Sequence, residues 1–400
     1  MRMIKVAFWY DYGLDYNGGL NYLRNLLYAI SLIKDKQFEP YVFFGLKTER
    51  RIIEQFEPYA KVVLTPVLER KTIPWFVHKV LFKLFRSQVV VNMVMKKHGI
   101  SVVSHSYYVY RRTKIFRLIT WIPDFQYLHL PELFPGVDTV SKTRHLQELI
   151  RQSEIVVLSS YEALSDFKTI APPECVCRGR VLQFVSQAPQ KLYKDSHTIT
   201  KNALERKFNF HGRFFFLPNQ FWQHKNHRDV FEAVRILKEK GKNVLVLCTG
   251  DIRDGRLKDK SHIDSLLNYI NANDLHDNIK ILGVIDYKEV LLLMKFSVAL
   301  LNPSRFEGWS SSVEEAKSIG KQVILSDINV HREQNPPGAH YFELDDAEGL
   351  SSILEDLWDM EPSLSNIELE REAQERLQVR MVEFGRAYVD IVNELAAKNA

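Results

Sequence analysis

The sequence is poor in cysteine and has no long apolar run. Its three cysteines, Cys175, Cys177 and Cys248, are too few and too close together for a disulfide scaffold, which predicts a reducing compartment. Cys175 and Cys177 would make half of a metal site, but no companion group of Cys and His follows. No stretch of about 18 apolar residues occurs, so we expect no membrane-spanning helix. The apolar run within residues 1–9 is also too short for a signal peptide.

The sequence also has no large excess of charge of one sign. The 54 Lys and Arg residues exceed the 49 Asp and Glu residues only slightly, which gives a net charge of +5. This balance permits an anionic partner but does not demand one, and we expect no nucleic-acid partner. A chain of 400 residues exceeds a comfortable single core, so two domains are expected.

A strand, a loop and a helix are predicted between residues 297 and 320. The apolar run 298–301 ends at Pro303 and is typical of a buried strand. Ser311 and Ser312 are each followed three residues later by Glu, the spacing of a capping box that begins a helix. Gly320 then provides the expected C-terminal stop, and an apolar strand follows. In an alternating α/β chain, this pattern predicts a parallel, doubly wound sheet.

Two carboxylates flank this predicted helix start. Glu307 lies in the loop after the strand, and Glu315 is expected in the first turn of the helix. Ligands bind at this edge of an open α/β sheet, and a helix start offers N–H groups to a phosphate. Two carboxylates beside such donors suit a ligand that is part polyol and part phosphate. The alternative is that Glu314 and Glu315 only favour the helix dipole and that Glu307 is a solvated loop residue.

This segment resembles the E-x7-E motif of the retaining glycosyltransferases of family 4, through Phe306-Glu307-Gly308 and Glu315-Ala316. Trp309 and Ser310 replace the Phe-Gly of that family. The resemblance implies the α/β GT-B fold, in which two Rossmann-like domains face a cleft. It places an acceptor-side domain at 1–190, a nucleotide-sugar-binding domain at 200–375 and a helix at 376–400 that returns to the first domain.

The loop 218–226 resembles the family's G-R-x-x-x-x-K loop, which grips the donor diphosphate. Lys225 fits the lysine, but Gln220 stands in place of the arginine. Asn219, His224 or backbone N–H groups would then share that role. A departing diphosphate gains negative charge, which a fixed cation stabilises.

Other matches to the family lie along the whole chain. Gly18 and Gly19, in a loop between a strand and a helix, match a glycine loop that lies against the donor phosphates or the acceptor, although such a pair is also a common turn. Asp124 matches an acceptor-side loop in which Pro123 replaces the usual His, and His129 is the nearest substitute. The resemblance implies backbone contacts of Gly283 and Val284 with the base.

Residues 74–86 predict a helix of another character. Lys79, Lys83 and Arg86 recur along one stripe, and aromatic and aliphatic residues fill much of the remaining surface. One interpretation is an interfacial helix on an anionic membrane. The other is a helix packed on the sheet with lysines that extend to solvent.

The resemblance implies a metal-independent retaining glycosyltransferase that needs no cofactor and uses a UDP- or GDP-linked sugar as donor. The expected catalytic residues are Glu307, Lys225, Asp124 and His129. The expected donor-binding residues are Glu315, Gly308, Trp309, Ser310, Ser311, Gln220, Asn219, Gly283, Val284, Gly18 and Gly19. The acceptor would be a glycan or a lipid-linked glycan in surface polysaccharide assembly. We expect a cytoplasmic protein, peripheral on the inner face of the plasma membrane if 74–86 binds lipid. The alternatives are a GT-B nucleotide-sugar epimerase and a non-catalytic nucleotide-sugar-binding scaffold.

Overall fold

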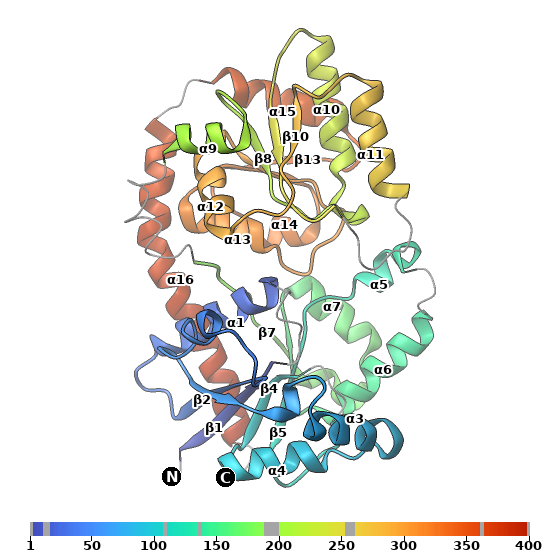
Figure 1. Ribbon diagram of the computed structural model, residues 1–400, viewed down its shortest axis with the longest axis vertical. Helices are drawn as coiled ribbons and strands as arrows, with labels where there is room; N and C mark the ends of the chain where they lie inside the picture. Colours follow the sequence, from blue (N-terminus) through green and yellow to red (C-terminus); the bar gives the residue numbers. More distant parts are fainter. Residues whose placement is uncertain are drawn as a thin grey trace. The chain divides into compact units, whose positions relative to one another are not determined.

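The computed structural model describes residues 3–10, 17–106, 110–134, 138–187, 200–252, 261–360 and 364–397. The chain forms two compact units, each built on its own sheet (Figure 1). The first unit consists of Met1–Leu128, Gly136–Val185 and Val379–Ala400, and the second of His129–Pro135 and Ser186–Gln378.

The first unit has a seven-stranded sheet in the order β3-β2-β1-β4-β5-β6-β7, and its strand pairs are parallel. Its strands are β1 (Ile4–Trp9), β2 (Phe38–Phe44), β3 (Lys61–Leu64), β4 (Val102–Ser106), β5 (Arg117–Ile122), β6 (Ile155–Leu158) and β7 (Gly179–Val181). Its helices and 3-10 turns are α1 (Asn17–Ser31), α2 (Arg50–Ile53), η1 (Pro66–Leu68), α3 (Ile73–Phe85), α4 (Val89–His98), α5 (Gln126–His129), α6 (Thr139–Gln152), α7 (Tyr161–Ile170) and η3 (Pro173–Arg178). His129, the last residue of α5, already belongs to the second unit.

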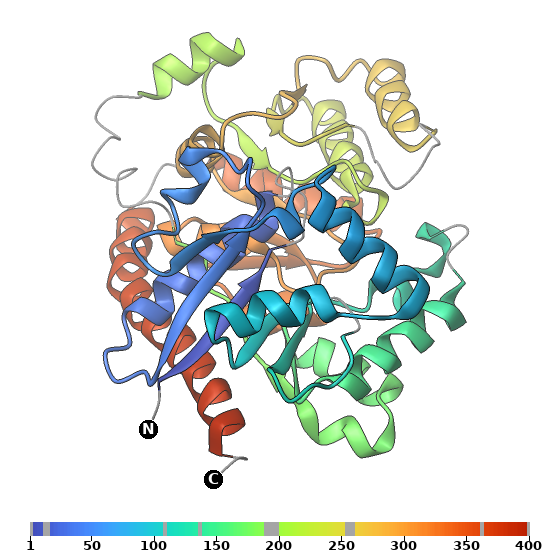
Figure 2. The same cartoon turned by 60° about the horizontal axis from the view of Figure 1, so that its bottom comes forward.

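Helices α3 and α4 lie next to each other on one side of this sheet (Figure 2). Val91 and Met95 of α4 pack into a core cluster with Ala7 of β1 and Phe43 of β2. All four side chains are fully buried. Helices that cover a parallel sheet explain why its strands are continuous apolar runs.

The second unit has a six-stranded sheet in the order β10-β9-β8-β11-β12-β13, whose strand pairs are also parallel. Its strands are β8 (Phe215–Leu217), β9 (Val246–Cys248), β10 (Ile279–Ile281), β11 (Leu300–Asn302), β12 (Val323–Ser326) and β13 (Ala339–Phe342). Its helices and 3-10 turns are η2 (Pro131–Leu133), α9 (Lys201–Phe208), η4 (Gln223–Lys225), α10 (His227–Glu239), α11 (Ser261–Ala272), α12 (Tyr287–Phe296), α13 (Ser311–Ile319), α14 (Asn329–Gln334) and α15 (Ala347–Asp359). The last helix, α16 (Leu364–Ala397), begins in the second unit, and from Val379 onward it belongs to the first.

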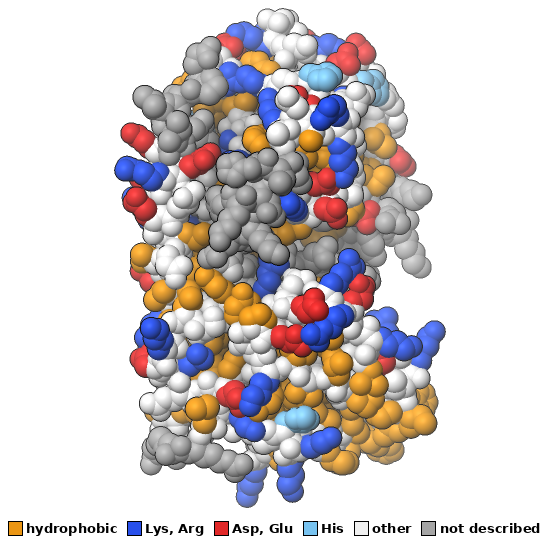
Figure 3. All heavy atoms as spheres, turned by 60° about the vertical axis from the view of Figure 1, so that its left-hand side comes forward, with side chains coloured by type: hydrophobic (Ala, Val, Ile, Leu, Met, Phe, Trp, Pro, Cys, Tyr) orange, Lys and Arg blue, Asp and Glu red, His pale blue; other side chains and the backbone are white. Residues whose placement is uncertain are grey.

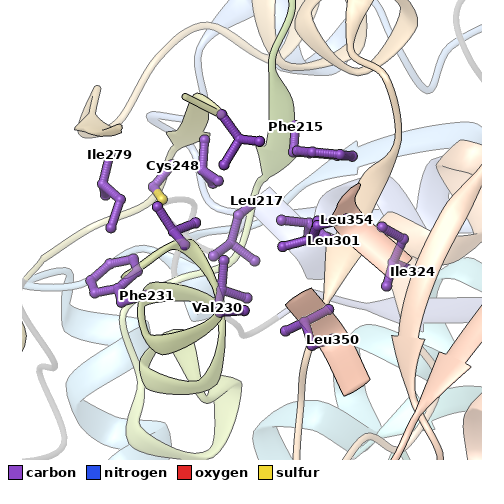
Figure 4. Packing of buried hydrophobic residues seen from close by; sticks show 14 of the residues in the cluster. Phe215, Leu217, Val230, Phe231, Cys248, Ile279, Leu301, Ile324, Leu350 and Leu354 are labelled. Carbon is purple, nitrogen blue, oxygen red and sulfur yellow. The ribbon is translucent and has the colours of Figure 1, made fainter. Parts of the chain in front are cut away.

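The aromatic run before the loop 218–226 divides the core of the second unit into two layers. Phe215 and Leu217 point to one side of the sheet, where they pack with Val230 of α10 and Leu350 of α15 (Figure 4). Phe214 and Phe216 belong to the cluster on the other side. Alternation of side chains along a strand therefore buries both faces of the sheet.

The predicted α/β class with two Rossmann-like sheets is confirmed, and α3 confirms the helix predicted at 74–86. Some local predictions were wrong. Gly18 and Gly19 lie in the first turn of α1 instead of the loop before it. Helix α13 begins as expected, but Glu315 lies just after its first turn, and the capping residue is Ser310, whose hydroxyl accepts from Val313 N at 3.5 Å. A hydroxyl can cap only where the chain turns into the helix, and that turn comes one residue before the pair that the sequence favoured.

Candidate functional site

Two loops meet at the centre of the second sheet. Strands β8 and β11 are neighbours there, and the order of strands reverses direction between them, as in a Rossmann sheet. The loop after β8 carries Lys225, and the loop after β11 carries Glu307. Arg305 N donates to His224 O at 2.8 Å, which ties the two loops together. The topology thus brings together residues that are far apart in the sequence.

Lys225 and Glu307 form a buried ion pair. Lys225 Nζ lies 2.6 Å from Glu307 Oε1, and the side chains are only 13% and 8% exposed. Burial alone would raise the pKa of Glu307, but the charge of Lys225, with a smaller effect of His331, lowers it to about 2. Glu307 is therefore an anion at neutral pH, and its second oxygen remains able to accept hydrogen bonds.

Asn302, the last residue of β11, forms hydrogen bonds that hold the loop after β11 in place. Its side-chain amide donates to Ser310 Oγ at 2.8 Å and, more weakly, to Glu307 Oε1 at 3.4 Å. Its Oδ1 accepts from Asn219 Nδ2 at 3.0 Å and from Ser304 Oγ at 2.6 Å. A fully buried amide with these partners fixes both loops. Sequence reasoning gave Asn302 no role, although its place at a strand end was a usable signal.

The start of α13 is fixed by Gln334 of α14. Ser310 N donates to Gln334 Oε1 at 3.1 Å, and Gln334 Nε2 donates back to Ser310 O at 3.0 Å. Gln334 Nε2 also lies 3.2 Å from Glu314 Oε1, and Lys317 Nζ lies 3.3 Å from the same oxygen. Glu314 of α13 therefore interacts with Gln334 and Lys317, and its surroundings differ from those of Glu315.

Glu315 has another partner. Tyr287, the first residue of α12, donates its hydroxyl to Glu315 Oε1 at 2.8 Å. Glu315 is 7% exposed, so this hydrogen bond keeps a buried carboxylate in one orientation. Sequence reasoning assigned Tyr287 no function.

The loop after β8 also uses Gln220, the residue in the arginine position. Gln220 Oε1 accepts from Asp251 N at 2.6 Å, so this side chain fixes the loop after β9. Gly250 in that loop has φ +142°, and an added Cβ would lie 2.5 Å from Asn219 O. Only glycine allows so close an approach. Gly250 N donates to Gly283 O at 2.9 Å, which orders the end of β10, next to the largely exposed Val284.

The model of the family described as "Glycosyl transferases group 1" matches residues 201–374, which include both loops and α13. Residues 201–374 of the chain are therefore similar to that family. The match covers the strands and helices of the second unit from α9 to α15.

A curated relative and solved structures are similar to this chain over most of its length. The O-antigen chain mannosyltransferase RfbU of Salmonella typhimurium is 22% identical over 299 residues, which cover 68% of this chain and 80% of that protein. Anabaena HepE, solved in complex with UDP and glucose, matches with a TM-score of 0.68 and 14% identity, over 98% of this chain and 100% of that one. Sucrose-phosphate synthase from Thermosynechococcus elongatus matches with a TM-score of 0.69 and 13% identity, over 99% and 100%. The GT-B fold is thereby confirmed.

The structure also gives the positions of other predicted site residues. Asp124 Oδ1 accepts from Gln126 N at 3.0 Å, at the start of α5. His129 ends α5, and its ring lies 5.1 Å from that of Phe306, next to Glu307. Gly308 and Trp309 are half-buried, and Ser311 is exposed. For these residues the assignment stays a prediction.

The first unit has a pocket where β1 and β4 end, at the reversal of its own strand order. Its lining is aromatic apart from a few residues, and consists of Phe8, Trp9, Tyr10, Gly19, Tyr22, Leu23, Ser104, His105 and Trp121. His105 has φ +58°, a conformation uncommon outside glycine. Its ring nitrogens lie 2.8 Å from the hydroxyls of Tyr22 and Ser104, and burial lowers its pKa to about 3. Sequence reasoning found Gly19 but missed His105.

The described residues show the following with respect to metal sites, disulfides and membrane-spanning helices. Among those residues, no group of three or more His, Cys, Asp or Glu side chains could hold a metal ion. The three cysteines are free. None of the described helices is long and apolar enough to cross a membrane.

Proposed function

We propose that this protein is a retaining glycosyltransferase that moves a sugar from a UDP- or GDP-linked donor to a glycan or lipid-linked glycan. The likeness to an O-antigen mannosyltransferase supports a role in the assembly of a surface polysaccharide. The UDP bound by the HepE structure supports a nucleotide-linked donor.

The observation that carries this proposal is the buried pair of Lys225 and Glu307 beside the start of α13. An ammonium group fixed at this position meets the charge that develops on a departing diphosphate. The first N–H groups of α13, which lack partners within the helix, would contribute to the same oxyanion. Because Lys225 is already held in place, little rearrangement is needed as the donor reacts.

We assign the two carboxylates to different parts of the donor. Glu307 would accept hydrogen bonds from hydroxyls of the transferred sugar, and Glu315, oriented by Tyr287, would hold the ribose diol. The departing phosphate would take the proton of the acceptor hydroxyl, in keeping with the low pKa of Glu307, which makes that carboxylate a poor base. Lysine and backbone donors would supply the charge stabilisation without a metal ion, so transfer should persist in EDTA.

The first unit would bind the acceptor. Asp124 is the residue of the first unit that we assign to the acceptor, and the pocket around His105 offers aromatic faces on which a sugar ring can stack. His129, which belongs to the second unit, stays a predicted catalytic residue. Neutral His105 would contribute a hydrogen bond and no charge.

The decisive variant is Glu307→Gln. Removal of the whole side chain would leave the buried Lys225 Nζ without this acceptor oxygen, at a cost of about 3–5 kcal/mol in stability. The amide keeps the shape and one acceptor oxygen but loses the charge. We expect transfer to fall by about 100-fold or more, while UDP or GDP still raises the melting temperature. The matched control is Glu343→Gln, an exposed carboxylate after β13, which should leave transfer unchanged.

Three results would refute the assignment. Transfer at the wild-type rate by Glu307→Gln would remove the role of the carboxylate. Release of an isomerised sugar without acceptor would identify an epimerase. Nucleotide binding without turnover by the wild type, over a panel of UDP- and GDP-sugars, would identify a binding scaffold.

A further inference from the structure

The outward face of α3 is apolar and exposed. Ile73 is 81% exposed, Phe76 62%, Val77 41%, Leu84 68% and Phe85 67%. We call these five side chains the α3 face. Soluble proteins rarely expose so many large apolar side chains on one short helix, and such a patch marks an interaction surface. Figure 3 shows hydrophobic side chains gathered at the lower right of its view, at the height that α3 and α4 have in Figure 1.

The helix is strongly sided. His78 is its one fully buried residue, and Phe82 packs with it against the core, with ring centroids 5.9 Å apart. Ile73, Val77 and Leu84 lie within about 40° of one another on the helix surface at 3.6 residues per turn, on the side opposite Phe82. The inward face thus packs against the core, while the large apolar side chains of the outward face stay exposed among the residues that the structure describes. Lysines that extend over a packed helix do not account for this arrangement, because its apolar residues are themselves exposed.

The charged residues on α3 and after it in the sequence have one sign. Between Glu69 and Asp124 the sequence has no Asp or Glu, but it has eleven Lys and Arg residues. Arg70, Lys71, Lys83 and Arg86 flank or lie on α3 and are exposed. Lys83 lies about 80° around the helix from Ile73, at the edge of the apolar stripe. Cations therefore border an apolar stripe.

We propose that the α3 face binds the surface of a membrane that contains anionic phospholipid. Apolar side chains would enter the boundary between headgroups and acyl chains, while the bordering cations attract the lipid phosphates. An anionic membrane surface therefore suits both the apolar side chains of the α3 face and the cations that border it. The inference concerns position in the cell rather than chemistry, and it does not depend on the proposed glycosyl transfer.

A second copy of the chain fits this face less well. A symmetric contact would bring the same patch of each copy together, and the basic residues of one would then meet those of the other. Like charges at close range oppose such a contact, whereas an anionic lipid surface is attracted.

The test is flotation of the full-length protein with vesicles. We expect it to float with vesicles of equal parts phosphatidylcholine and phosphatidylglycerol but not with phosphatidylcholine alone. Binding should weaken as salt rises from about 0.1 to 0.5 M, because screening shortens the reach of the charges.

Two variants separate the contributions of apolar contact and charge. The first, Phe76→Ser with Leu84→Ser and Phe85→Ser, removes the apolar stripe. The second, Lys83→Glu with Arg86→Glu, reverses the bordering charge. Each should weaken binding by about tenfold or more.

A matched control carries Val140→Ser and Lys168→Glu, which change exposed residues of α6 and α7 by the same chemistry. It should bind as the wild type does. All the substituted side chains are exposed, so melting temperatures should stay unchanged. Equal binding by the wild type and both α3 variants would overturn the proposal, as would a wild type that ignores anionic vesicles. Lipid-free dimers that the α3 variants abolish would assign the face to a second copy instead. Transfer to a soluble acceptor tests the proposed function separately.

Discussion

Glu307 is ionised in a buried position because Lys225 Nζ lies 2.6 Å away. Burial of either charge alone is costly, and the pair is tolerable only while both members are present. The pKa of Glu307, lowered to about 2, records this dependence. In the proposed reaction the ammonium group would keep this contact and direct its remaining N–H groups toward the diphosphate of the donor.

The low pKa of Glu307 predicts a loss of stability in acid. The folded pKa of about 2 lies below the ordinary value of 4.5, so the stabilisation is complete above pH 4.5 and is lost as the pH falls toward 2. A shift of this size corresponds to roughly 3–4 kcal/mol. Urea unfolding should therefore show a steeper fall in the free energy of unfolding between pH 5 and 3 for the wild type than for Glu307→Gln. Parallel pH profiles of the two proteins would contradict this account of the pair, and Glu343→Gln should follow the wild type.

At the scale of elements, α14 sets where α13 begins. The side-chain amide of Gln334 bonds both the N–H and the C=O of Ser310, the capping residue of α13. The same residue reaches Glu314 one turn into the helix. One side chain from a neighbouring element thereby positions the loop that carries Glu307 and the helix that carries Glu315.

Substitution of Gln334 should therefore disturb the site at a distance from the chemistry. Gln334→Met keeps the size of the side chain but leaves two buried backbone groups of Ser310 without these partners, at a cost of about 1–3 kcal/mol in stability. We expect the KM for the donor to rise severalfold, because the N–H groups at the start of α13 would be less well fixed. Gln374→Met on the exposed side of α16 is the matched control. An unchanged KM together with lowered stability would restrict Gln334 to a structural role.

At the scale of the whole molecule, α16 contributes to both units. From Val379 onward it belongs to the first unit, where Tyr388 donates to Ser104 Oγ at 2.7 Å, and Ser104 in turn contacts His105. Arg180 forms a two-point ion pair with Glu394 near the end of the helix. The last part of the chain thus completes the core of the first unit.

Close packing of α16 depends on Gly385. A Cβ at this position would lie 2.2 Å from Ala29 O of α1, so the two backbones approach more closely than any other residue allows. Alanine normally favours a helix over glycine by about 1 kcal/mol. Here Gly385→Ala should instead destabilise the protein by about 1–3 kcal/mol, because α16 must move. Thermal unfolding of this variant, with Glu383→Ala on the exposed side of α16 as control, tests the sign. A stabilised Gly385→Ala protein would contradict the packing.

The sequence by itself determined the alternation of strands and helices, because apolar periodicity and turn residues act locally. It also placed Glu307 and Lys225 in loops at strand ends, and the resemblance to family 4 glycosyltransferases paired them in one site. The amphipathic pattern at 74–86 was readable too, but its two interpretations could not be separated until the exposure of the α3 face was known.

Only the tertiary structure decided which side chains support the site. Gln334 lies 24 residues from Ser310, and Tyr287 lies 28 residues from Glu315, so no spacing in the local sequence predicts these hydrogen bonds. His105 takes its left-handed backbone and its neutral ring from the strands and helices that enclose it. Hydrogen bonds and burial of this kind depend on the order of strands in a sheet, which brings distant residues together. Periodicity decides which elements form, whereas their packing decides what each polar side chain meets.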